Sequence, residues 1–157
     1  MNKDWSFKYE HYSCGVRVNG VLLKNGCIFL QREKGGEEYA VPGGQLKIGE
    51  TLEEALIREY HEEAGAKIFC RRLLWTEECF WEYNGTHMHT LNFYYLIDAE
   101  NYAVFPERGS FVPQGDNPNI ELGFVPLKNL SNMTVYPRFL EKELLCIGEI
   151  KHFITKE

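Results

Sequence analysis

The stretch 43–65, GGQLKIGETLEEALIREYHEEAG, constrains the fold of this chain more than any other part of it. Thr51 and Glu54 are three residues apart and form a capping-box pattern, which starts a helix. Gly65 suits the left-handed conformation that ends one. The pattern therefore predicts a helix over about residues 52–64.

At 3.6 residues per turn, this helix divides into two neighbouring faces. The apolar face comprises Leu52, Leu56, Ile57, Tyr60 and Ala64. The face beside it carries three carboxylates, Glu59, Glu62 and Glu63. Like charges at these spacings cost about 0.2–0.5 kcal/mol per pair, and glutamates are unfavourable near the carbonyl end of a helix. Such local violations concentrate at functional positions, so the cluster is a candidate site; a solvated acidic face is the alternative.

Glycines precede the helix. Gly43, Gly44 and Gly49 allow positive φ angles and close approach to the main chain. We expect a ligand to lie against this backbone, where Glu50 and the helix deliver carboxylates. Clustered carboxylates with open positions suit Mg²⁺ or Mn²⁺, which bind few carboxylates together with water and substrate phosphates. The sequence therefore predicts a divalent metal site between the glycine loop and the helix.

The stretch resembles the signature of the Nudix hydrolases: Gly, five residues, Glu, seven residues, Arg-Glu, an aliphatic residue, any residue, Glu-Glu, any residue, Gly and an aliphatic residue. The fixed positions here are Gly44, Glu50, Arg58, Glu59, Glu62, Glu63 and Gly65. The two aliphatic positions hold Tyr60 and Ala66, which are departures that bear on packing and not on chemistry. Seven fixed residues at fixed spacing make a specific match.

The resemblance implies hydrolysis of the diphosphate linkage of a nucleoside diphosphate joined to another group, by attack of water on phosphorus with Mg²⁺ or Mn²⁺. It implies that Glu62 and Glu63 are metal ligands. Glu59 would be either a metal ligand or the base for the attacking water.

The resemblance gives supporting roles to other residues. Arg58 would be the ion partner that holds the acidic face together, within an i+4 step of Glu62. Gly44 would offer its carbonyl oxygen to a metal, Gly43 would contact the substrate, and Glu50 would make a supporting salt bridge or a substrate contact. Arg32 would clamp a phosphate.

Two of the implied residues have ordinary alternatives. Arg32 and Lys34 follow an apolar strand and also suit a solvated strand end. Glu121 begins a late strand in a segment that resembles the family, and we expect it to be a metal ligand because two-metal sites need carboxylates on both sides of the phosphorus. A solvent-facing strand position is the alternative for Glu121.

Other activities remain open from the sequence. Some members of the family cleave nucleoside triphosphates to monophosphates, and a Nudix-like domain can also be a non-catalytic, nucleotide-binding regulatory module. The complete set of motif glutamates with Arg58 favours an enzyme, because a binding module has no need of a strained carboxylate cluster.

The rest of the chain favours an α+β fold. Asn25-Gly26 and Asn84-Gly85, each between apolar runs, predict hairpins, and we interpret Asn19-Gly20 as a bulge in one long strand. Strands interrupted by two helices, the second over about 136–146, indicate a mixed sheet. The resemblance makes this a Nudix-type α/β/α sandwich with a mixed central sheet flanked by helices.

Residues 99–119 have the composition of a long loop, which in a compact domain is usually functional or mobile. Aromatic residues in and before this loop are candidates for stacking on a nucleobase, with core packing as the alternative. They are Trp75, Phe80, Trp81, Tyr83, Phe105 and Phe111.

A length of 157 residues suits a single domain, here over 13–157, preceded by a tail or edge segment over 1–12. The net charge of −6 argues against general nucleic-acid binding. Five widely spaced cysteines indicate neither a disulfide framework nor a zinc site. Because no apolar run suits a membrane span or a signal peptide, we expect a cytoplasmic protein that binds a small nucleotide, as a monomer or homodimer.

Overall fold

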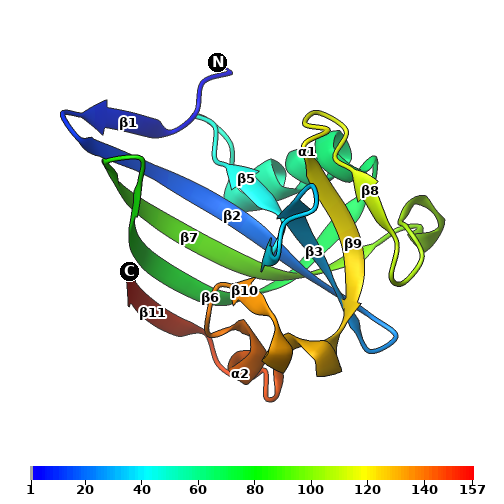
Figure 1. Cartoon of the computed structure of the whole chain (residues 1–157). Coiled ribbons are helices and arrows are strands. Elements are labelled where there is room, and N and C mark those ends of the chain that lie inside the picture. Colours follow the sequence, from blue (N-terminus) through cyan, green and yellow to red (C-terminus); the bar gives the residue numbers. More distant parts are fainter. Residues whose placement is uncertain (1) are drawn as a thin grey trace.

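The computed structural model describes residues 2–157 and builds them mainly from β-strands (Figure 1). The strands are β1 (Ser6–Tyr9), β2 (Tyr12–Lys24), β3 (Cys27–Glu33), β4 (Glu38–Ala40), β5 (Gly43–Gln45), β6 (Ile68–Tyr83), β7 (Thr86–Ala99), β8 (Phe111–Pro113), β9 (Ile120–Pro126), β10 (Thr134–Tyr136) and β11 (Lys151–Lys156). The helices are α1 (Leu52–Ala64) and α2 (Leu140–Leu144), and two 3₁₀ turns are η1 (Tyr102–Val104) and η2 (Leu127–Asn132). Within residues 2–157, no helix has both the length and the apolar character needed to cross a bilayer.

The strands form a mixed sheet, as predicted. Its main path runs β10-β4-β3-β2-β7-β6-β11, with β1 and β5 paired to β2 and with β9 between β3 and β8. Three pairs are parallel, β2 with β7, β4 with β10, and β6 with β11, while the other pairs of named strands are antiparallel. The 1–12 segment supplies β1, which is an edge strand on β2.

Both predicted hairpins are confirmed. Asn25 and Gly26 join β2 to β3 with φ angles of 49° and 73°, and Asn84 and Gly85 join β6 to β7 with 49° and 76°. Two successive positive φ angles match the right-handed twist of the flanking strands. The local sequence therefore fixed these two turns.

The predicted bulge at Asn19-Gly20 is wrong, although β2 is one long strand. The register of β2 against β7 continues through Asn19 opposite Tyr94 and Gly20 opposite Tyr95 without a shift. A Cβ on Gly20 would lie 2.9 Å from the ring of Tyr60, whose hydroxyl donates to the Gly20 carbonyl at 2.9 Å. Gly20 is therefore needed for space beside α1 and not for a backbone irregularity.

Helix α1 begins and ends at the predicted residues. Thr51 and Glu54 form the capping box, and Gly65 is left-handed with φ 63°. The predicted apolar face needs one correction, because Ile57 is 41% exposed and Ala55 is fully buried. The helix packs on β2, β5 and β6, so the buried arc is rotated toward Ala55.

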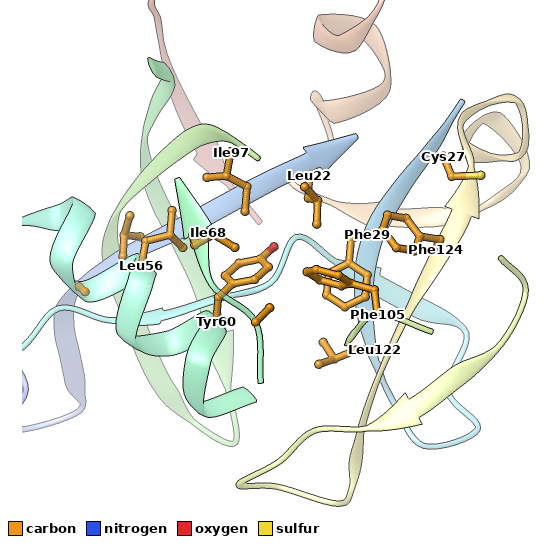
Figure 2. Packing of buried hydrophobic residues seen from close by; sticks show 13 residues of the cluster. Leu22, Cys27, Phe29, Leu56, Tyr60, Ile68, Ile97, Phe105, Leu122 and Phe124 are labelled. Atoms are coloured by element: carbon orange, nitrogen blue, oxygen red, sulfur yellow. The ribbon is translucent and has the colours of Figure 1, made fainter. Parts of the chain in front are cut away.

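Apolar residues fill both sides of the sheet. Alternate residues of β3 belong to two clusters. Phe29 packs with Leu56 and Tyr60 of α1 (Figure 2). Ile28 belongs to the cluster that includes Leu140 of α2. Successive side chains of a strand point to opposite faces, so β3 is buried on both. The central strands thus hold α1 rigidly in place.

Three other expectations are corrected. The second helix spans only Leu140–Leu144, because Tyr136 is paired with Ala40 in the extended strand β10. The segment 99–119 is not wholly loop, since it contains η1 and β8. Strand β11 was not predicted; it lies parallel to β6 at the sheet edge in Figure 1.

Candidate active site

The glycines before α1 serve close packing inside the protein. Gly43 and Gly44 belong to β5, which pairs with β2, so they are strand residues and not the predicted loop. A Cβ on Gly43 would lie 2.1 Å from the carbonyl oxygen of Val18, and a Cβ on Gly44 would lie 2.1 Å from the carboxyl carbon of Glu59. The group that approaches the Gly44 backbone is therefore the Glu59 side chain.

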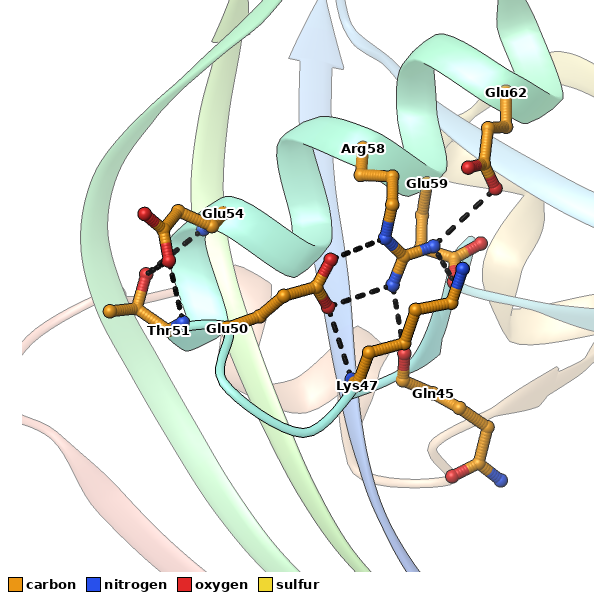
Figure 3. Close-up of polar contacts among 8 residues, drawn as sticks. All are labelled: Gln45, Lys47, Glu50, Thr51, Glu54, Arg58, Glu59 and Glu62. Carbon is orange, nitrogen blue, oxygen red and sulfur yellow. Dashed lines mark hydrogen bonds and ion pairs between the residues drawn. The ribbon is translucent and has the colours of Figure 1, made fainter. Parts of the chain in front are cut away.

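Arg58 lies at the centre of the polar contacts on α1 (Figure 3). Its guanidinium donates to Glu50 through Nε at 2.6 Å and Nη2 at 3.0 Å, and through Nη1 to Glu59 at 2.8 Å. It also donates to the carbonyl of Gln45 at 3.1 Å and to Glu62 at 3.4 Å. The expected salt bridges of Arg58 with Glu62 and Glu50 are present, and Arg58 joins β5, the loop before the helix and the acidic face.

The ionisation of this cluster follows from these bonds. The Arg58 hydrogen bonds lower the pKa of Glu50 against the opposing effect of burial, and the Lys47 amide adds to the shift. The Glu50 bonds in turn raise the pKa of Arg58 above its usual value. Charge-assisted, two-pronged contacts of this type are strong and directional. Arg58 and Glu50 thus form a fixed ion pair beside the other carboxylates.

Glu63 differs from the other carboxylates. Burial, together with the negative charges of Glu59 and Asp116, raises its pKa to about 8 against the opposing effects of Arg17 and Gln114. Glu59 is 9% exposed and Glu62 lies at the surface. Residues of one helix face thus differ widely in exposure.

The segment after β8 contacts the end of α1, which the sequence did not predict. The amide of Gly115 donates to the carbonyl of Glu63 at 2.8 Å. Gln114 and Asp116 on either side act on the Glu63 carboxyl. No pattern in the sequence relates residues 114–116 to the helix. This contact is the part of the predicted 99–119 loop that lies beside α1.

Glu121 and Arg32 lie together on neighbouring strands. They are directly opposite in β9 and β3, and Arg32 Nε donates to Glu121 at 3.1 Å. Arg32 also donates to the Tyr39 hydroxyl at 2.9 Å and stacks over Phe111 at 4.1 Å. The Glu121 partner in the structure is therefore Arg32. The metal-ligand role of Glu121 and the phosphate role of Arg32 stay predictions.

A cavity of about 800 Å³ begins next to this site. Arg17 and Gln45 both line it; the Gln45 carbonyl accepts a hydrogen bond from Arg58, and the charge of Arg17 opposes the rise in the pKa of Glu63. The opposite wall comes from β6, β7 and β11 and includes Trp81 and Thr155. A volume of about 300–1,000 Å³ is typical of small-molecule sites. The cavity therefore meets the polar contacts of α1 at Gln45.

Comparison with known proteins decides the family. The NUDIX domain model matches residues 15–141, which is most of the chain. This chain belongs to the NUDIX domain family. The predicted resemblance is therefore confirmed, and β1 and β11 lie outside the matched range.

One curated relative of this Nudix chain is the ADP-ribose pyrophosphatase of Methanocaldococcus jannaschii, which is 42% identical over 62 residues. The match covers 37% of each chain, so it spans just over a third of the length of that relative. It is consistent with the family assignment and is too short to transfer the relative's activity.

Solved structures confirm the fold. An ADP-ribose pyrophosphatase from Streptococcus suis has a TM-score of 0.60 at 18% identity, with 88% of this chain and 98% of that chain covered. A MutT protein from Bacillus halodurans has a TM-score of 0.62 at 16% identity, with 90% of each covered. A UDP-X diphosphatase has a TM-score of 0.55 at 19% identity, with 92% of this chain and 69% of that chain covered. At these identities the likeness establishes the Nudix fold alone.

The donor set of the Nudix motif suits a hard cation. The groups on the acidic face are carboxylate oxygens with a backbone strand beside them, and Glu63 is held at an unfavourable place for a negative charge. Oxygen donors of this type fit Mg²⁺ or Mn²⁺. Within residues 2–157, no three His, Cys, Asp or Glu side chains already converge on one metal position. Arg58 instead neutralises Glu59 in this state.

In this Nudix fold, the aromatic candidates for base stacking lie in different places: in the core, at the cavity or at the surface. Trp75 and Phe105 are 2% and 8% exposed and belong to the core, so the prediction that they stack on a nucleobase is wrong. Phe111 packs against Arg32. Trp81 lines the cavity, whereas Tyr83 projects at the surface of the β6–β7 hairpin. Trp81 remains the candidate that a ligand in the cavity can reach.

Proposed function

We propose that this chain is a metal-dependent Nudix pyrophosphohydrolase. The reaction is hydrolysis of the diphosphate linkage in a nucleoside diphosphate joined to another group, by attack of water on phosphorus. The observation that carries the proposal is the Arg58 network, which holds Glu50, Glu59 and Glu62 together and reaches, through the Gln45 carbonyl, a residue that lines a cavity of about 800 Å³. The Nudix fold alone would not support this activity, because Nudix folds also serve other functions.

The proposal names the residues that hold the metal. Glu59, Glu62 and Glu63 would bind Mg²⁺ or Mn²⁺ with the carbonyl oxygen of Gly44. Bound divalent metal supplies activation of water at neutral pH and neutralises charge that develops on the phosphate oxygens. Glu121 is proposed as a further ligand from β9.

The remaining roles belong to the protein itself. Arg58 fixes the direction of the Glu59 carboxylate, which either binds metal or accepts the proton of the attacking water. Glu50 orients Arg58, and Glu50 and Gly43 of β5 are proposed to contact the substrate. Arg32 is proposed to contact a substrate phosphate, for which its guanidinium would have to leave part of its contact with Glu121.

A substrate panel tests the proposal. We would incubate the protein with ADP-ribose, UDP-sugars, dinucleoside polyphosphates and nucleoside triphosphates, each with Mg²⁺ and with Mn²⁺, and separate the products by chromatography. Release of two monophosphate products from a diphosphate-linked substrate is expected. Pyrophosphate release from triphosphates would instead support the pool-cleaning activity. No turnover of any compound, together with nucleotide binding, would support the regulatory module and overturn the proposal.

The setting of this activity is part of the same proposal. We expect a cytoplasmic protein that binds a small nucleotide, with no general nucleic-acid or membrane partner. Its state as a monomer or homodimer is to be measured by light scattering during the same preparation.

A further inference from the structure

A buried carboxylate lies at the floor of the cavity. Glu77 of β6 lines the cavity and is only 3% exposed. It accepts three hydrogen bonds, from Asn92 Nδ2 at 2.9 Å, from the Tyr94 hydroxyl at 2.7 Å and from Thr155 Oγ1 at 2.7 Å. Buried charges are stable when they are hydrogen-bonded in this way. The metal-binding machinery of α1 uses none of these residues.

The Glu77 bond determines how Asn92 is oriented. The amide nitrogen of Asn92 faces the Glu77 carboxylate, and the reverse orientation would place two acceptors against each other. The Asn92 oxygen Oδ1 is therefore directed away from Glu77. Asn92 is 9% exposed and lines the cavity, and its Oδ1, which is itself buried, has no hydrogen-bond partner among residues 2–157.

Other acceptors of the cavity share this condition. Gln31 Oε1 and Gln45 Oε1 also have no partner within residues 2–157, and both residues line the cavity. An unsatisfied buried acceptor costs about 1–3 kcal/mol, so a ligand that donates to it gains that amount relative to one that does not. The wall of the cavity thus holds three buried acceptors to which no described residue donates.

We propose that this cavity selects nucleotides by an amino-bearing edge of the base, with Asn92 Oδ1 as the acceptor and Glu77 as the residue that positions it. The proposal rests on the proposed function for the placement of the phosphates, because Arg17 and Gln45 line the cavity and also act on Glu63 and Arg58 of α1. Trp81 supplies an aromatic wall next to the base. The substrate class is a nucleotide of adenine, cytosine or guanine.

The C-terminal strand contributes to the position of this acceptor. Thr155 of β11 donates to Glu77, and Glu157 also lines the cavity. Both residues lie outside the range 15–141 that the NUDIX domain model matches. The family motif on α1 therefore supplies the chemistry, while β11 helps to fix the acceptor that reads the base.

Binding of nucleoside monophosphates tests the inference without any hydrolysis. We would measure AMP against IMP and CMP against UMP by calorimetry in excess chelator, since each pair differs by replacement of an amino group with a carbonyl. We expect the amino-bearing member to bind about tenfold more tightly, which is about 1.4 kcal/mol. Equal affinities within both pairs, or no binding of any of the four, would overturn the inference.

Variants locate the selectivity. Asn92→Ala, which leaves Glu77 two other donors, is expected to reduce each preference to about threefold or less. Glu77→Gln frees the Asn92 amide to reverse and should reduce each preference in the same way. Glu78→Gln is the matched control and should keep the preference, because Glu78 is a neighbouring carboxylate on β6 that pairs with His152. An undiminished preference in a folded Asn92→Ala protein would assign selection to other residues. If that variant does not fold, the wild-type pairs decide the question.

These results are separable from those of the substrate panel. A preference for amino-bearing monophosphates in a protein that hydrolyses nothing would refute the proposed function and leave the pocket standing. Hydrolysis in the substrate panel, together with equal binding of the two members of each monophosphate pair, would refute the pocket alone.

Discussion

At the scale of single residues, the acidic face of α1 is tolerable because Arg58 is inserted into it. Arg58 and Glu50 are both about one-fifth exposed, and the guanidinium satisfies three carboxylates at once. Exchange of both partners of a partly buried ion pair for apolar groups changes the stability of the fold little. Loss of one partner alone leaves the others uncompensated and lowers the stability. The stability of the face thus depends on the arginine more than on any one glutamate.

Arg58→Ala is expected to lower the free energy of unfolding by about 2–4 kcal/mol and to abolish activity, because Glu50 and Glu59 lose their partner. Denaturant titration of the metal-free protein measures the loss. Arg71→Ala is the control, since the exposed Arg71–Asp98 pair should contribute less than about 1 kcal/mol. Equal losses in the two variants would contradict the central role of Arg58.

Glu63→Gln is expected to lose most of kcat and yet to stabilise the metal-free fold at alkaline pH. Because folding raises the pKa of Glu63 from 4.5 to about 8, the folded protein loses stability as pH rises between these values, where the unfolded chain gives up its proton more easily. The glutamine removes this loss. The gain in Tm over wild type should therefore be larger at about pH 9 than at about pH 5.

Glu62→Gln serves as the comparison for Glu63→Gln. The Glu62 side chain is 40% exposed and holds Arg58 at 3.4 Å, so its change should lower kcat with little effect on Tm at either pH. A marked fall in the Tm of both metal-free variants would argue against strain in the acidic face.

Glu121→Gln is expected to lower kcat about tenfold or more, at about 1.4 kcal/mol of transition-state stabilisation per factor of ten. The Arg32–Glu121 pair is partly exposed, so stability should change little. Asp116→Asn, in the segment that contacts the end of α1, is the informative comparison. Wild-type kinetics in Glu121→Gln at saturating metal would show that β9 supplies no ligand.

At the scale of elements, the site depends on how closely β5 approaches α1. The Glu59 carboxyl fills the position that a side chain on Gly44 would take, so the strand and the helix fit only with glycine there. The backbone of β5 also accepts a hydrogen bond from Arg58 at Gln45. The signature glycine therefore sets the distance between the strand and the glutamates.

Gly44→Ala is expected to displace Glu59 and to reduce kcat by about tenfold or more, with a loss of stability of about 1–3 kcal/mol from overpacking. Gly148→Ala is the matched control, because a Cβ at Gly148 meets no atom within 4 Å. Steady-state kinetics and thermal melting of the two variants check the effect. A Gly44→Ala enzyme with wild-type kinetics would show that Glu59 can act from another position.

At the scale of the whole molecule, the proposed function requires a protein of net charge −6 to bind a polyanion at an acidic helix. Such a field opposes the substrate unless cations compensate it locally. Arg17 and Arg138 line the cavity, but Arg58 is already engaged with carboxylates. Divalent metal is therefore expected to be needed for substrate binding as well as for chemistry.

Activity should require Mg²⁺ or Mn²⁺ and should rise toward alkaline pH. Deprotonation of Glu63 and of the attacking water both increase with pH, and a carboxylate with a pKa of about 8 must lose its proton to bind metal. Rates across the pH range, with and without excess chelator, measure this dependence. Full turnover in chelator, or a rate that falls steadily from acid to alkaline pH, would contradict the metal mechanism.

The sequence by itself determined the features that depend on neighbouring residues. The capping box and Gly65 set the limits of α1, and the Asn-Gly pairs set two hairpins, because each involves backbone angles and hydrogen bonds within a few positions. The spacing along the helix also placed Arg58 within reach of Glu62. These parts of the fold and of the site were predictable.

Only the tertiary structure decided which distant residues meet. Arg32 and Glu121 are 89 residues apart, and Glu77 and Thr155 are 78 apart, yet strand pairing makes each a direct contact. The same holds for Gly44, which is tight because α1 packs on β5. Such contacts depend on the register of strands that are remote in the chain, and a shift of one residue would turn every side chain to the other face.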